Sequence, residues 1–569
     1  MRTLLCLTVS MAALGAGLVA GGAGPANDDA RLAWWREARF GLFIHWGPVA
    51  LKGTEIGWSR GAQVPVAEYD QLYRRFNPTN FDATAWARLA REAGCRYLIL
   101  TAKHHDGFAL WDSAVSDYDI AATPFRRDVV KELGEACRRE GVVFGTYYSI
   151  LDWWHPDYPT GSPGGRTRKP NPNMARYVQY LHAQVTELIR DHGPLGVMWF
   201  DGEWEAPWTE EMGRELYALC RRLQPSIIVN NRVAKARRGM EGASAADRFA
   251  GDYDTPEQRV GRYQDDRPWE SCITLCRQWA WKPNDRMKSL EQCLRTLALC
   301  AGGDGNLLLN VGPMPDGRIE PRQAARLREI GAWLRTHGEA VYGTRGGPWK
   351  PGPWGASTRR DRRVYLHLFQ PDQPVRLPRL PRRIVSARTL PGKPVTLRQE
   401  DDSLRIEVPA GARETPITVV VLELDGSAMD LPAVETGPPN LARGCAAKAS
   451  NVFQGMVTTY GPAKAVDGRE NTRWATDAGT RQAWLELDLG QPRTIGAVTI
   501  QEAYPGRVQR FRIERETAGG WETILEGGRL GERFHRSFDP VKARRVRLSI
   551  QDATEGPTIA EFALHPPGH

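Results

Sequence analysis

Cysteine is scarce in this sequence, with nine residues among 569. That density is far below that of a disulfide scaffold, which excludes the class of small disulfide-stapled domains. The C-x-x-C spacing of a zinc site is also missing, since Cys272 and Cys276 do not have it and no second pair lies nearby. Apolar helix-like surroundings, as in "LEQCLRTLALC", favour buried thiols, although the eight cysteines after the N-terminal segment would permit disulfides in an exported chain.

Long runs of one charge are absent as well. The 76 basic and 67 acidic residues leave a net charge of +9, and the arginines are scattered along the chain. Such a mildly basic surface does not indicate a nucleic-acid groove, so we expect no nucleic-acid partner. The hydrophobic content of 41% and the charged content of 25% are those of a globular protein and argue against disorder.

A single stretch is apolar enough to compare with a membrane span. The run "LLCLTVSMAALGAGLVA" follows Arg2 and precedes a series of small residues. It contains glycine, and its length is at the lower limit of the ~17–25 residues that a spanning helix needs. A signal peptide over residues 1–26 is therefore the better interpretation. We expect a periplasmic or secreted protein that is not inserted in a membrane after cleavage.

Two periodicities alternate from residue 27 to residue 347. Apolar strand-like runs such as "RYLIL" and "GVMWF" are separated by helix patterns such as "KELGEACRREG". Strands that alternate with helices indicate parallel pairing, and the length suits an α/β fold, a (β/α)8-like TIM barrel. Seven strands are visible in the pattern, so the eighth is missing or irregular.

The pattern changes after residue 347. Short alternating runs separated by proline and glycine predict a small antiparallel β-sandwich over residues 348–425. Residues 426–439 are typical of a linker. From 440 to 569, runs such as "AWLELDLGQ" again alternate apolar and polar residues, which predicts a second β-sandwich with Trp474 in its core.

Polar and aromatic residues follow the predicted barrel strands where each strand ends. His45, His104, His105 and Asp201 all have such positions, and in this fold the carboxyl ends of the strands line one pocket. Aromatic walls, imidazoles and two separated carboxylates suit a sugar ring. Glycoside hydrolysis needs one carboxylate as nucleophile or base and one carboxylic acid. Asp201, held on a rigid strand, is the best candidate nucleophile.

Several strings carry a resemblance to a known family. The segments "RFGLFIHWG", "YLILTAKHHDGFALWDS", "FGTYYS", "VMWFDGEW", "WESCITL" and "GGDGNLLLNVGPMPDGRI" resemble, in order, the α-L-fucosidases of glycoside hydrolase family 29. The resemblance implies a barrel followed by a β-sandwich. It also implies a retaining exo-α-L-fucosidase that acts on fucosylated oligosaccharides or polysaccharides through a covalent glycosyl-enzyme intermediate, with no cofactor in catalysis.

The resemblance assigns roles to individual residues. Asp201 of "WFDG" matches the nucleophile, Glu270 of "WESCIT" matches the acid/base, and Glu257 of "DYDTPEQRV" is the runner-up. A retaining reaction implies carboxyl groups only ~5–5.5 Å apart. The residues expected to contact the sugar or to orient a carboxylate are His45, Glu55, Trp58, His104, His105, Tyr148, Trp199 and Arg232.

The C-terminal block resembles the discoidin or coagulation-factor type C domain, through "NLARGCAAKASN", "AVDGRENTRWAT" and "AEFALH". This resemblance implies a jelly roll that binds carbohydrate, with a structural calcium near Asp467 and Glu561. Two other functions remain open. One is a non-catalytic glycan-binding protein on the same fold, and the other is a retaining glycosidase for a fucose-like sugar such as α-L-galactose.

Overall fold

The computed structural model describes residues 30–245, 247–437, 439–468 and 472–567. The predicted signal peptide lies outside the described residues. Among the helices of the described ranges, none is long and apolar enough to cross a membrane. The chain divides into two compact units after Glu435, within the linker predicted over 426–439, and each unit is described by itself.

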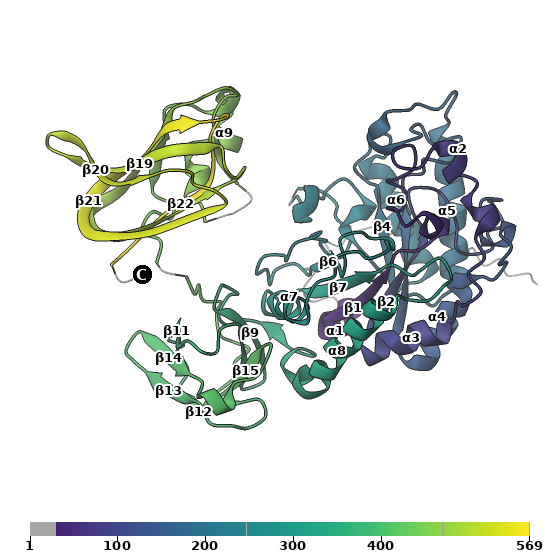
Figure 1. The fold of residues 1–569 in the computed structure, drawn as a ribbon, viewed down its shortest axis with the longest axis horizontal. Helices are drawn as coiled ribbons and strands as arrows, with labels where there is room; N and C mark the ends of the chain where they lie inside the picture. The colour runs from purple at the N-terminus through teal and green to yellow at the C-terminus, as the bar shows by residue number, and fades with distance from the viewer. Residues whose placement is uncertain (1–29, 246, 438, 469–471, 568–569) are drawn as a thin grey trace, which may run out of the picture. The chain divides into compact units, whose positions relative to one another are not determined.

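A parallel sheet of seven strands forms the centre of the first unit (Figure 1). Its order is β5-β4-β3-β2-β1-β7-β6, and every neighbouring pair is parallel. The predicted α/β barrel class is therefore confirmed. The strands are β1 (Phe40–Ile44), β2 (Tyr97–Lys103), β3 (Val143–Ser149), β4 (Val197–Asp201), β5 (Ile228–Val229), β6 (Glu270–Thr274) and β7 (Asn306–Val311).

An irregular segment, and not a regular strand, connects β5 to β6. Tyr253 pairs with Asn230 just after β5, and Glu257 pairs with Cys272 of β6, each as an isolated parallel bridge. This segment takes the place of the strand that is missing from the sequence pattern. Its position between β5 and β6 puts Glu257 in the wall of the barrel.

Amphipathic helices follow most of the strands, and side-chain caps start five of them. Asp82 accepts a hydrogen bond from Ala85 N at the start of α3, and Gly141, with a φ of 71°, ends α4. The helices of the barrel region are α1 (Ala33–Ala38), α2 (Val66–Tyr69), α3 (Ala83–Glu92), α4 (Val129–Glu140), α5 (Met174–Arg190), α6 (Glu210–Leu223), α7 (Leu290–Gly302) and α8 (Pro321–His337).

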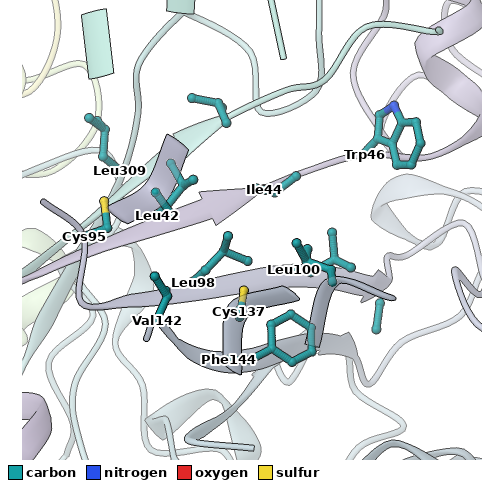
Figure 2. Packing of buried hydrophobic residues seen from close by; sticks show 14 of the residues in the cluster. Leu42, Ile44, Trp46, Cys95, Leu98, Leu100, Cys137, Val142, Phe144 and Leu309 are labelled. Atoms are coloured by element: carbon teal, nitrogen blue, oxygen red, sulfur yellow. The ribbon is translucent and has the colours of Figure 1, made fainter. Parts of the chain in front are cut away.

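The core of the barrel region packs aliphatic strand residues against the helices. Figure 2 shows Leu42 of β1 and Leu98 of β2 together with Cys95 and Cys137. All eight cysteines of the described residues are free thiols, and only Cys445 is partly exposed. The interpretation of the cysteines as buried small apolar side chains is confirmed.

Two antiparallel sheets complete the first unit. A five-stranded sheet, β12-β15-β10-β9-β8, and a three-stranded sheet, β11-β14-β13, share one apolar core. Val434 pairs with Trp349, so part of the predicted linker is built into this unit. The strands are β8 (Arg345–Gly346), β9 (Gly355–Arg360), β10 (Arg363–Leu368), β11 (Val375–Pro378), β12 (Ile384–Thr389), β13 (Thr396–Gln399), β14 (Ser403–Glu407) and β15 (Thr418–Leu424).

The second unit is an antiparallel β structure around its own core, in which Trp474 is fully buried. Leu485 and Leu487 of the predicted alternating run point into this core, and Glu486 between them is half-buried. Its elements are β16 (Ala446–Ala449), α9 (Val457–Tyr460), β17 (Trp474–Ala475), β18 (Ala483–Glu502), β19 (Val508–Thr517), β20 (Gly520–Gly527), β21 (Arg533–Ala553) and β22 (Thr558–His565).

Candidate active site

A cavity of about 340 Å³ opens at the carboxyl ends of the barrel strands. His45 follows β1, His104 and His105 follow β2, and Asp201 is the last residue of β4. Polar groups from separate strands therefore meet in one place, as expected for this fold. The predicted site residues that line the cavity are His45, Trp58, His104, His105, Trp199, Asp201, Arg232 and Glu257.

Asp201 is held as a carboxylate by its partners. Its Oδ1 accepts a hydrogen bond from Arg232 Nη1 at 2.7 Å, and its Oδ2 accepts one from the Tyr147 hydroxyl at 3.0 Å. Burial alone would raise the pKa of Asp201, but the charges of Arg232 and Arg237 outweigh burial and hold the pKa below its usual value. Asp201 therefore stays ionised at neutral pH, and ionisation is what a carboxylate nucleophile requires.

A row of alternating charges extends from Asp201 along the cavity. Arg232 also contacts Glu257 Oε2, at 3.0 Å. Arg237 contacts the same Glu257 oxygen at 3.1 Å, and it contacts Glu203 Oε1 at 3.2 Å. Burial raises the pKa of Glu203 to about 7. Its Oε2 is buried, and no atom of the described residues hydrogen-bonds to it. Glu203 is thus a third carboxyl group in the cavity, and its Oε2 is available to hydrogen-bond a ligand.

The histidines present neutral nitrogens to the cavity. Asn310 donates its amide to Trp279 O, so its Oδ1 accepts a hydrogen bond from His45 Nδ1 at 2.6 Å. Burial lowers the pKa of His45 to about 3 and that of His105 to about 4. A neutral imidazole that donates through Nδ1 keeps an acceptor at Nε2. We assign this tautomer to His45 from its hydrogen bonds, and a sugar hydroxyl can donate to that Nε2.

His105 has the same arrangement. Ser149 Oγ donates to Leu151 O at 2.6 Å, so it accepts from His105 Nδ1 at 2.7 Å. The Nε2 atom of His105 lies 3.7 Å from Asp201 Oδ2. The neighbouring His104 also lines the cavity, and its Nδ1 is buried with no hydrogen-bond partner within the described part of the chain.

Glu270 does not lie where its predicted role as the acid requires. It is the first residue of β6, so it stands at the amino end of its strand, whereas the cavity is at the carboxyl ends. Its side chain is fully buried and accepts hydrogen bonds from the Tyr97 hydroxyl and from Trp199 Nε1. Glu257 lines the cavity instead. The structure therefore contradicts the placement of Glu270 in the pocket and favours the runner-up.

Tyr148 and Glu55 also lie outside the cavity. Adjacent residues on a strand point to opposite faces, so Tyr147 lines the cavity while the Tyr148 hydroxyl donates to Gln184 of α5. The Glu55 carboxylate accepts hydrogen bonds from the backbone of Trp279 and Ala280. The structure therefore does not bring these two side chains to the cavity with the other predicted residues. Glu55 instead fixes the loop that carries Trp279 into the cavity wall.

Ten lining residues were not among the predicted site residues: Phe43, Tyr147, Glu203, Trp204, Lys235, Arg237, Gly239, Met240, Cys272 and Trp279. The period-2 rule applied to "FGTYYS" could have chosen Tyr147 over Tyr148. Glu203 and Trp204 come shortly after Asp201 in the chain. Gly202, which lies between Asp201 and Glu203, has a φ of 95°, and this conformation lets the chain turn out of β4. Arg237 and Trp279 lie on long irregular loops that carry no local signal.

The residues predicted to bind calcium lie in the second unit. Glu561 accepts hydrogen bonds from Asn440 Nδ2 and Gly468 N, and Asp467 accepts one from Thr472. Burial, together with the nearby charge of Asp467, raises the pKa of Glu561 to about 7. A buried carboxyl group whose pKa is raised beside a second carboxylate fits a site completed by a cation. Calcium there stays a prediction, because no group of three or more possible ligands occurs among the described residues.

Comparisons with known proteins cover both units. Residues 25–339 match the family model of the alpha-L-fucosidases, and residues 446–563 match that of the F5/8 type C domain. Tissue alpha-L-fucosidase from Rattus norvegicus is 30% identical over 360 residues, which are 58% of this chain and 72% of that protein. The tissue alpha-L-fucosidase of Bos taurus is 31% identical over 355 residues, 57% and 72% of the two chains.

Solved structures agree with these matches. Alpha-L-fucosidase isoenzyme 1 from Paenibacillus thiaminolyticus has 35% sequence identity and a TM-score of 0.63, and the match covers 70% of this chain and all of that one. A GH29 alpha-L-fucosidase from Bacteroides thetaiotaomicron, trapped as a covalent intermediate, has 27% identity and a TM-score of 0.63 over 70% and 97% of the two chains.

Proposed function

Because this chain belongs to the α-L-fucosidase family of glycoside hydrolases, we propose that it is an exported, retaining exo-α-L-fucosidase. Glycoside hydrolase activity towards fucosylated glycans follows from the family. The retaining course, the attack on terminal fucose and the export of the protein are the parts that we add. Support for export comes from the apolar N-terminal segment of the sequence.

We assign the nucleophile to Asp201. The Tyr147 hydroxyl and Arg232 hold its two oxygens in defined positions, and Arg232 keeps it ionised. In the first step, a carboxylate oxygen of Asp201 bonds to the anomeric carbon while the bond from that carbon to the leaving oxygen breaks. The likeness to a relative that was trapped as a covalent intermediate supports this course.

We assign the acid/base role to Glu257. The observation that carries the proposal is that one guanidinium, that of Arg232, contacts both Asp201 at 2.7 Å and Glu257 at 3.0 Å. This contact holds the two carboxyl groups close together, which favours the ~5–5.5 Å spacing of retaining enzymes over the ~6.5–9.5 Å spacing of inverting ones. Glu257 would give its proton to the leaving oxygen and then take one from the water that releases fucose.

The inner cavity supports fucose over α-L-galactose. Phe43 and Trp279 line it with their rings 6.0 Å apart, edge to face, and they form an apolar corner next to His45. A methyl group at C5 suits such a corner, whereas a hydroxymethyl group would lose hydrogen bonds to water there. The neutral imidazoles of His45 and His105 supply acceptors for the ring hydroxyls.

The first test is the release of nitrophenol from an aryl α-L-fucoside by the wild type and by Asp201→Ala. Turnover in the wild type, its loss in Asp201→Ala, and its rescue there by azide with formation of a fucosyl azide would support a retaining reaction through Asp201. Equal loss in an exposed control, Asp361→Ala, would point to a general effect of substitution. An inert wild type would contradict the proposed function.

A further inference from the structure

The cavity has two zones that differ in exposure. In the inner zone, Tyr147 and Trp199 are each 1% exposed and Asp201 is 8% exposed. In the outer zone, Trp58 and Trp204 are each 42% exposed. These two are the exposed tryptophans of the described chain, and both line this same cavity. Large apolar side chains left exposed at the mouth of a polar pocket indicate a surface that a ligand covers.

The two exposed indoles are fixed in place. Their rings lie nearly parallel, at 17° and 6.3 Å between centroids, and both meet His105 edge to face. Beneath them, the buried Trp153 packs against Trp58 and donates its Nε1 to Glu205. The pair is therefore a preorganised aromatic surface, so a ligand would lose little conformational entropy in ordering it.

A second loop, which carries Lys235, is hydrogen-bonded to the segment that carries Trp204. Lys235 donates through Nζ to the backbone oxygen of Glu205, the residue after Trp204. The same loop brings Met240, which is 48% exposed, to the cavity mouth. Met240 and the two indoles thus make an outer zone that is mainly apolar, in contrast to the inner zone of imidazoles and carboxyl groups.

We propose that Trp204, with Trp58 and Met240, forms a subsite for the sugar to which fucose is attached. This inference rests on the proposed function. An exo-acting enzyme holds the terminal sugar in the inner zone, so the next pyranose of the glycan must leave through the outer zone. The apolar C–H face of a pyranose stacks on an indole, as the ring surface of the pair allows. The natural substrate is therefore a fucosylated saccharide whose penultimate ring covers Trp204.

The test compares two substrates that differ only beyond the scissile bond. Fucosyl fluoride has a single-atom leaving group and makes no contact in the outer zone. The second substrate is the best cleaved of four disaccharides, with fucose linked 1→2 to galactose or 1→3, 1→4 or 1→6 to N-acetylglucosamine. For Trp204→Ala we expect the ratio of kcat/KM for the disaccharide to kcat/KM for the fluoride to fall about 10-fold, or ~1.4 kcal/mol.

Two further variants make the result specific. Trp204→Phe keeps an aromatic face and should recover part of the ratio. Val115→Ala removes an equally exposed apolar side chain away from the cavity and should leave the ratio unchanged. If Trp204→Ala lowered kcat/KM equally for both substrates, or for neither of them, the result would contradict the proposed subsite. Hydrolysis of fucosyl fluoride by the wild type upholds the proposed function in either case. A wild type that cleaves neither substrate refutes that function, and the subsite with it.

Discussion

Two clusters of buried charges lie at opposite ends of the barrel strands, and they differ in what their oxygens contact. At the carboxyl ends, Asp201 and Glu257 share Arg232 and face the cavity, and one oxygen of Glu203 there has no partner within the described chain. At the amino ends, Asp304 lies just before β7 and Arg39 just before β1. Both oxygens of Asp304 are used, by Arg39, Arg36, Arg345 and the backbone of Gly346.

The difference shows how to distinguish a site from a structural clamp. A buried charge has a cost unless it is paired, so both clusters are paired. The cluster at the carboxyl ends has a carboxyl oxygen, Oε2 of the cavity-lining Glu203, that lacks a hydrogen-bond partner among the described residues. At the amino ends, both oxygens of Asp304 are occupied by partners that join β1, β7 and the start of the antiparallel sheets. Both clusters contain buried charges, so burial alone does not distinguish them. A carboxyl oxygen that lies next to a cavity without a hydrogen-bond partner indicates the candidate active site.

The largest effect should come from Asp201→Asn. The amide cannot attack the anomeric carbon, so we expect kcat/KM on an aryl fucoside to fall by at least about 10³-fold. The matched variant at the other end, Asp304→Asn, should keep kcat/KM within about threefold. Steady-state kinetics on both proteins decides the point. A comparable loss in Asp304→Asn would erase the contrast between the two clusters.

The next largest effect should be the difference in kcat between Glu257→Gln and Glu270→Gln. Removal of a general acid should lower kcat by about 10²–10⁴-fold on a fucoside with a poor leaving group, and much less on fucosyl fluoride, which needs no proton. Glu270→Gln, at the amino end of β6, should change the two substrates in parallel. If Glu270→Gln lowered kcat on the fucoside with a poor leaving group much more than on fucosyl fluoride, the acid role would belong to Glu270.

Asp304→Asn should have its main effect on stability. Loss of the negative charge leaves Arg39, which is fully buried, without its ion-pair partner. We expect the free energy of unfolding of the first unit to fall by about 3–5 kcal/mol. Urea denaturation followed by tryptophan fluorescence measures it, with the exposed Asp361→Asn as the control. An unfolding midpoint equal to that of the control would show that the clamp contributes nothing.

The smallest effect is on the pH dependence of stability. Burial raises the pKa of Glu270 from 4.5 to about 7. Between these values the native state keeps a proton that the unfolded state has released, so the free energy of unfolding falls as pH rises, by at most about 1.4 kcal/mol per pH unit. Glu270→Gln should flatten that decline between pH 5 and 7. Parallel curves for wild type and variant in urea titrations would contradict the shift.

Local sequence patterns were enough to predict the barrel, the strand ends that carry His45, His105 and Asp201, and the β-structure of both later segments. These features depend on local periodicity, and periodicity is written in neighbouring residues. The resemblance to the family indicates Tyr148, whereas the alternation of side chains along β3 puts Tyr147 in the cavity. The family motif likewise indicates Glu270 but does not show that this residue stands at the amino end of β6.

The carboxyl groups that meet in the cavity could not be predicted from local patterns, because their meeting depends on the tertiary structure. Glu257 reaches the cavity on an irregular segment that pairs with β6 through isolated bridges, and such a segment has no periodic signal. Arg232 and Arg237 link Glu257 to Asp201 and Glu203. Trp204 stacks on Trp58, which lies on a separate loop. These contacts arise from the closure of the barrel, which brings together residues far apart in the chain, and no local pattern encodes that closure.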